Sequence, residues 1–157
     1  MRINHRRRVI VLCNRQRGLS LLEVLIAVLV LSIGMLGVAA MQTTNIKNSQ
    51  SAHLRSVAVV LAAGMAERIR AQPQLATAGS FSLTKQCASL SAGNSLAQRE
   101  LASWLNDIRL KLGELETTCG AIVHDSNSRT YTVQVIWDDS RALGGLSAMT
   151  ISNTVRY

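Results

Sequence analysis

The chain has 157 residues, 48% of them hydrophobic and 17% charged, which fits one small folded domain and argues against a disordered chain. Its formal net charge is +8, but residues 1–18 hold six arginines and no acid, and the rest carry 11 basic and 9 acidic side chains. Beyond that first segment there is little excess of cations for phosphate contacts. Five aromatic residues in all also disfavour a nucleic-acid-binding function.

The first predicted element is an apolar helix over residues 19–41. This run of 23 residues contains a single charge, Glu23, and a helix of that length crosses a hydrocarbon core of about 30 Å. The arginines before it place residues 1–18 in the cytoplasm, by the positive-inside rule. The sequence therefore predicts a single-pass membrane protein with its C-terminal part on the far side of the membrane.

The helical pattern continues as an amphipathic segment over residues 42–72, because the first proline is Pro73. One helix of about 54 residues, roughly 80 Å long, is therefore expected from residue 19 to about 72. Its second half should pack on a small globular head through one apolar stripe. That stripe comprises Leu54, Val57, Ala58, Leu61, Ala62, Met65 and Ile69.

The head, residues 73–157, is predicted to begin with a surface loop over 74–93, which shows no sustained period. A helix over about 95–112 follows, with Ser95 and Gln98 at the spacing of a capping box. Its apolar stripe ends before a glycine, Gly113, and consists of Leu101, Trp104, Leu105, Ile108 and Leu112.

The tail alternates with a period of two, which predicts antiparallel strands over about 121–124, 130–137 and 148–156. Tyr131, Val133, Val135 and Trp137 should share one face. A sheet of three to four strands needs a covering helix, and the amphipathic segment is the obvious candidate. The predicted fold class is α+β, with a long N-terminal helix packed on a small antiparallel sheet and an additional short helix.

Cys87 and Cys119 both lie in the part predicted to be exported, where an oxidising periplasm allows them to pair. The three histidines are too scattered to predict a metal site, and no motif indicates a cofactor. The sequence has none of the common catalytic motifs, so an enzyme is not expected. Asp138 and Asp139 follow a strand directly and are interpreted as turn residues or a solvated edge.

The basic leader ends at Arg17 and is followed directly by Gly18. Glu23 lies five residues after that glycine, inside the apolar run. This arrangement resembles the type IV prepilin signature. The resemblance implies cleavage by a prepilin peptidase between Gly18 and Leu19, followed by N-methylation of Leu19.

Independently, a carboxylate in hydrocarbon is costly unless it finds a cation, and a new α-amine on a neighbouring chain supplies one. Glu23 is therefore predicted to be the charge partner in assembly.

The stretch LSLLEVLIAVLVLSIGMLGVAAMQ resembles the start of PilV-type minor pilins. The Trp104-Leu105 pair on a later helix and the strand ending in Trp137-Asp138-Asp139 also resemble features of these proteins. This resemblance implies a subunit of type IV pili with roles in pilus biogenesis, adhesion or twitching motility. The implied partners are other minor and major pilins and a PilY-type tip adhesin. Minor pseudopilins of type II secretion, especially GspI, share the same leader and remain an alternative.

Two further interpretations stay open. Val38 and Ala40 fit the small-residue spacing of an ordinary signal peptide cleaved before Met41, although this apolar run is longer than usual and carries an acid. A plain membrane anchor explains the length of the run. It does not explain why Gly18 and Glu23 occur together.

Overall fold

The computed structural model describes Gly18 and residues 20–157. Two compact units meet between Ala40 and Met41, inside the first helix. In chain order, the elements are α1 (Leu21–Arg70), α2 (Pro73–Thr77), β1 (Leu83–Gln86), α3 (Leu96–Leu112), β2 (Cys119–Asp125), β3 (Thr130–Trp137) and β4 (Met149–Arg156).

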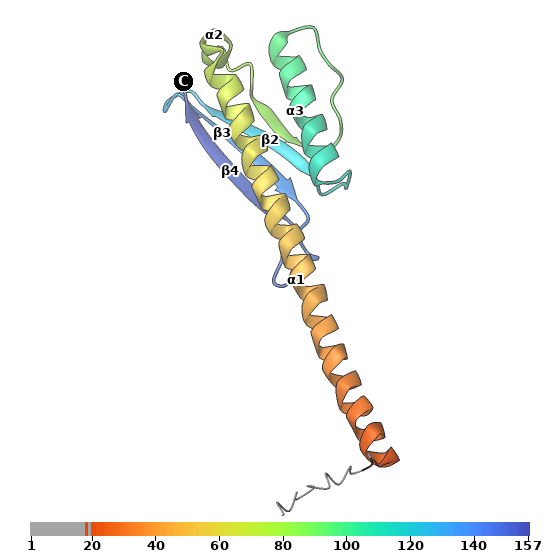
Figure 1. The fold of residues 1–157 in the computed structure, drawn as a ribbon. Helices are drawn as coiled ribbons and strands as arrows, with labels where there is room; N and C mark the ends of the chain where they lie inside the picture. The colour runs from red at the N-terminus through yellow and green to blue at the C-terminus, as the bar shows by residue number, and fades with distance from the viewer. Residues whose placement is uncertain (1–17, 19) are drawn as a thin grey trace, which may run out of the picture. The chain divides into compact units, whose positions relative to one another are not determined.

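The second unit, residues 41–157, contains a four-stranded antiparallel sheet in the order β1-β2-β3-β4 (Figure 1). Val135, on the central strand β3, pairs with Gly120 of β2 and with Ile151 of β4. The four side chains predicted to share one face of β3 are all fully buried. The predicted α+β fold class, a long apolar helix on a small antiparallel sheet, is confirmed.

The part of α1 within this unit packs on the sheet through the predicted stripe. Ala58, Leu61, Ala62, Met65 and Ile69 are buried, while Leu54 and Val57 are partly buried at the edge of the core. Their three- and four-residue spacing places these side chains on one side of the helix, and burying them removes apolar surface from water. This packing contributes to the stability of the head.

The prediction of a surface loop over residues 74–93 is wrong in part, because this segment contains most of α2 and the whole of β1. Pro73 ends the first helical pattern, but it also occupies the first turn of α2. Proline is tolerated there because the first N–H groups of a helix have no hydrogen-bond acceptor within the helix. Strand β1 has four residues and is held by pairing with β2, where Leu83 lies opposite Ile122. A strand fixed by a distant partner leaves no local period in the sequence.

Helix α3 begins with the predicted capping box: the Ser95 hydroxyl accepts from the Gln98 N–H, and the Gln98 side chain accepts from the Ser95 N–H. Trp104, on the buried side of α3, donates its indole N–H to the Leu61 carbonyl of α1 at 3.0 Å. A Cβ on Gly120 of β2 would lie 2.7 Å from the Trp104 ring. Glycine at this position therefore lets α3 pack closely on the same face of the sheet as α1.

Candidate membrane and assembly segment

Helix α1 begins at the position of the sequence motif. The Val24 N–H donates to the Ser20 carbonyl at 3.2 Å, and Glu23 stands in the first helical turn. An acid at this end is favoured by the free N–H groups and the dipole of the helix. Gly18 is exposed, whereas Arg17 and Leu19 lie outside the described residues.

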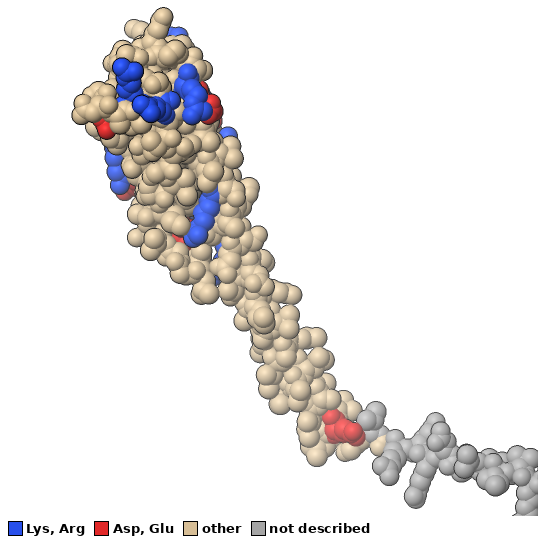
Figure 2. Space-filling model, turned by 90° about the vertical axis from the view of Figure 1, so that its left-hand side faces the viewer, with Lys and Arg blue, Asp and Glu red and all other residues tan. Residues whose placement is uncertain are grey.

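The first unit of the chain presents an apolar surface over residues 21–40. Every Leu, Ile, Val and Met side chain from Leu21 to Met41 is between 48% and 80% exposed. In Figure 2 this part of the helix shows no basic side chain and one acidic group, at its end. The sequence has no charged residue between Glu23 and Lys47. Such a surface requires lipid or other apolar helices around it.

Within the described residues, α1 is the one helix long and apolar enough to cross a membrane, and its most apolar window has a mean hydropathy of 2.7. That window is not buried by any other part of the chain. The segment is therefore consistent with anchoring in the inner membrane.

A family model, described as the prokaryotic N-terminal methylation motif, matches residues 13–39. The matched range contains Gly18, Leu19 and Glu23, and it ends just before the boundary between the two units. No curated protein and no solved structure matches the chain. The motif together with the apolar helix supports a type IV prepilin-like protein of the pilin or pseudopilin kind.

The two aspartates after β3 differ from each other. Asp138 is partly exposed and accepts from the Ser140 N–H at 2.8 Å, which agrees with a turn residue. Asp139 is 3% exposed and accepts hydrogen bonds from Ser51 and Arg55 of α1. The prediction of a solvated edge is therefore wrong for Asp139, whose carboxylate ties a loop to the helix.

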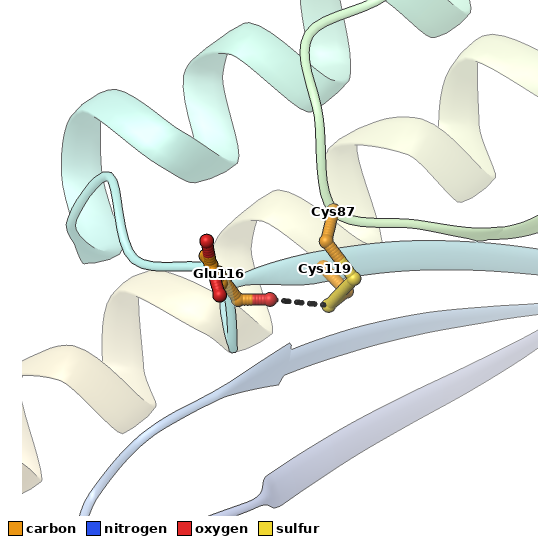
Figure 3. Close-up of a disulfide and its surroundings, with 3 residues drawn as sticks. All are labelled: Cys87, Glu116 and Cys119. Carbon is orange, nitrogen blue, oxygen red and sulfur yellow. Dashed lines mark hydrogen bonds between the residues drawn. A yellow bond between two sulfur atoms is a disulfide. The ribbon is translucent and has the colours of Figure 1, made fainter.

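Cys87 follows β1, and Cys119 begins β2 (Figure 3). Their sulfurs are bonded at 2.10 Å, and the Cys119 sulfur also lies 3.7 Å from the Glu116 carbonyl oxygen. The bond closes a loop that contains α3. The third cysteine, Cys13, lies outside the described residues.

Over Gly18 and residues 20–157, no three acidic, histidine or cysteine side chains lie close enough together to hold a metal ion. His124, the histidine within the sheet, instead stacks on Tyr131 and makes a 2.7 Å hydrogen bond with the Tyr157 hydroxyl. It has a packing role in the head.

Proposed function

We propose that this chain is a non-enzymatic minor pilin of the PilV type. A prepilin peptidase cuts between Gly18 and Leu19, and the new N-terminal residue, Leu19, is methylated. The processed chain is held in the inner membrane by the first half of α1, with its head in the periplasm. It is then incorporated into type IV pili or primes their assembly.

The observation that carries this proposal is one acid in the first turn of an otherwise uncharged, exposed apolar helix. Glu23 stands four residues after Leu19, so cleavage creates a cation close to it in sequence. Within one helical chain the two charges would lie about one turn, or roughly 6 Å, apart in depth. Among parallel, staggered helices, Glu23 of an incoming subunit meets the α-amine of a neighbour, and each charge loses part of its cost in hydrocarbon. Pairing of this kind sets the axial register between subunits.

The proposed partners are other minor and major pilins, which present similar apolar helices, and a PilY-type adhesin at the fibre tip. The head needs no cofactor for this role. Its stable core keeps the C-terminal half of α1 folded while the N-terminal half exchanges lipid for neighbouring helices.

The intact mass of the chain extracted from membranes tests the processing step. The expected mass corresponds to a chain that begins at Leu19, with one added methyl group. A chain that begins at Met41 would identify an ordinary signal peptide, and an uncut chain would identify a plain anchor. Either result overturns the proposal.

A second experiment tests the role in pili. Fibres sheared from cells are expected to contain the processed chain, and deletion of the gene is expected to reduce piliation. Normal piliation combined with a loss of protein secretion would overturn the pilus assignment in favour of a GspI-like pseudopilin, because both kinds of protein share the leader and the apolar helix.

A further inference from the structure

Strand β4 forms one edge of the sheet and presents a row of backbone groups along it (Figure 1). All eight of its residues pair with β3 in one unbroken register. Just beyond that register the Tyr157 N–H donates to the Arg129 carbonyl, so the odd-numbered residues of β4 exchange hydrogen bonds with β3. The N–H and C=O groups of the even-numbered residues 150–156 therefore point away from the sheet. Within the described residues, no backbone group of another element bonds to them.

The opposite edge of the sheet is protected in ways that β4 is not. Strand β1 has four residues, an irregular register with β2 and an exposed lysine, Lys85. The bond between Cys87 and Cys119 also ties the end of β1 to β2. Short length, irregular pairing and charge are the usual means by which a sheet prevents another strand from joining it. Strand β4 has none of them between Met149 and Val155, so its edge is open to an added strand.

The side chains of β4 define what an added strand must present. Thr150, Ser152 and Thr154 are exposed on one face of the sheet. Met149 and Ile151, on the other face, are partly buried and pack against the core. Because opposite residues of neighbouring strands point to the same face, a fitting strand alternates apolar and hydroxyl side chains.

Arg156 gives this edge its one charge. It is exposed, and the ion pairs among the described residues do not include it. Asp125 is separated from it by Thr130 of β3, which places the two residues about 10 Å apart. Asp125 also accepts hydrogen bonds within its own turn. A strand that joins β4 is therefore favoured when it carries an acid opposite Arg156.

We infer that the β4 edge binds an extended segment of another protein by antiparallel strand addition. The segment is about as long as β4 and begins with an acid opposite Arg156, followed by alternating apolar and hydroxyl residues. A second copy of this chain does not supply such a strand at its own sheet edges, because neither β1 nor β4 contains an acid. All the residues involved belong to the second unit, so the inference is independent of the cleavage and membrane anchoring in the proposed function.

A peptide built on β4 itself serves as the probe, because its alternation fits the edge. It has the sequence of residues 149–155 preceded by an aspartate, with an acetylated and an amidated end. Amide hydrogen exchange of the full chain in detergent micelles, followed by NMR, measures binding. The outward N–H groups of Thr150, Ser152 and Thr154 are expected to exchange rapidly in the free chain and to slow by about tenfold or more with the peptide. Unchanged exchange at a saturating peptide concentration overturns the inference.

Two N-methylated peptides separate strand addition from non-specific adsorption. Methylation of the peptide's threonine and serine nitrogens removes the N–H groups that would face β4, and should abolish the slowing. Methylation of its isoleucine and asparagine nitrogens removes N–H groups that face away, and should preserve it. Equal effects of the two peptides contradict pairing along the edge.

Two variants of the chain test the same contact from the other side. Ser152→Pro removes one outward N–H, a change that a sheet edge accepts, and should abolish binding while the emission of the buried tryptophans stays unchanged. Arg156→Glu leaves the backbone intact. It should weaken binding of the aspartate peptide and strengthen binding of a peptide that begins with lysine. An identical response of Arg156→Glu and the parent chain to both peptides overturns the acid opposite Arg156.

The chain without peptide provides the last comparison. Slow exchange of the outward N–H groups that increases with the concentration of the chain would assign the edge to a second copy. That result overturns the inference of a different partner.

Discussion

Asp139 and Arg55, 84 residues apart, join the loop after β3 to helix α1 through two hydrogen bonds to one carboxylate oxygen, at 2.8 and 3.1 Å. The Ser51 hydroxyl donates to the same oxygen at 2.8 Å. The aspartate is almost fully buried, whereas the arginine is 44% exposed. The ion pair is therefore partly screened by solvent, and its main effect is to hold the loop in one position.

Asp139→Ala is expected to lower the free energy of unfolding by about 1 to 3 kcal/mol, because it leaves the buried Ser51 hydroxyl without its partner. Denaturant unfolding in detergent, followed by the emission of the two buried tryptophans, measures this loss. The control is Asp138→Ala, which removes only an exposed turn contact and should cost about 1 kcal/mol or less. Equal losses from the two variants would contradict the special role of Asp139.

Gly120→Ala is expected to destabilise the head by about 1 to 3 kcal/mol through overpacking. The added methyl group would lie 2.7 Å from the Trp104 ring and 2.8 Å from the Leu105 side chain, both buried and unable to move freely. Gly64→Ala, on an exposed position of α1 with no atom within 4 Å of the new Cβ, is the control. It should stabilise the helix by about 0.5 to 1 kcal/mol, so the two substitutions should shift the unfolding midpoint in opposite directions.

The contacts of Asp139 and Gly120 show which parts of this structure could be predicted from the sequence. The helix over 21–70, the buried face of β3 and the capping box of α3 each follow from a local spacing of apolar or capping residues. The burial of Asp139 depends on Ser51, 88 residues away. No periodicity encodes such a contact, and the same applies to β1, which exists because β2 lies beside it. Gly18, Leu19 and Glu23 were found by their order in the chain, and their roles remain proposals.

The pKa of Asp125 is held below its usual value by a side-chain hydrogen bond from Ser128 and by backbone N–H groups of Asn127 and Ser128. A folded-state pKa below the unfolded one adds stability that is present above the unfolded pKa, near 3.8, and is lost as pH falls through the folded pKa. Ser128→Ala should therefore raise the pKa of Asp125 and move the acid loss of stability to higher pH.

A carboxyl-carbon NMR titration of Asp125 measures this change. Ser126→Ala, in the same turn, is the control because the hydrogen bonds to Asp125 come from Asn127 and Ser128. The explanation fails if both variants titrate at the same pH as the parent chain.

The Cys87 to Cys119 bond closes a loop with a sequence separation of 32 residues, for which chain entropy predicts a stabilisation of about 3 to 4 kcal/mol. Replacing both cysteines with alanine should lower the free energy of unfolding by about that amount. Cys13→Ala should leave it unchanged, since Cys13 precedes the proposed cleavage site. Reaction of both Cys87 and Cys119 with a thiol label in the native exported protein would show that the bond is absent there.

Glu23→Val separates membrane insertion from assembly. Removing the one charge of the apolar segment makes insertion more favourable, so the variant is expected to reach the membrane and to be cleaved after Gly18. Its incorporation into fibres should fall sharply, because the α-amine of the neighbouring subunit then has no anionic partner in an apolar bundle. The matched control is Glu67→Val, which removes an exposed acid of the same helix that pairs with Arg70 three residues later. Immunoblots of sheared fibres and of membranes, compared for the two variants, measure incorporation against the processed pool. Because Glu67 lies outside the apolar segment, its loss should leave incorporation near that of the parent chain, and equal incorporation of both variants would remove the charge-pairing role from Glu23.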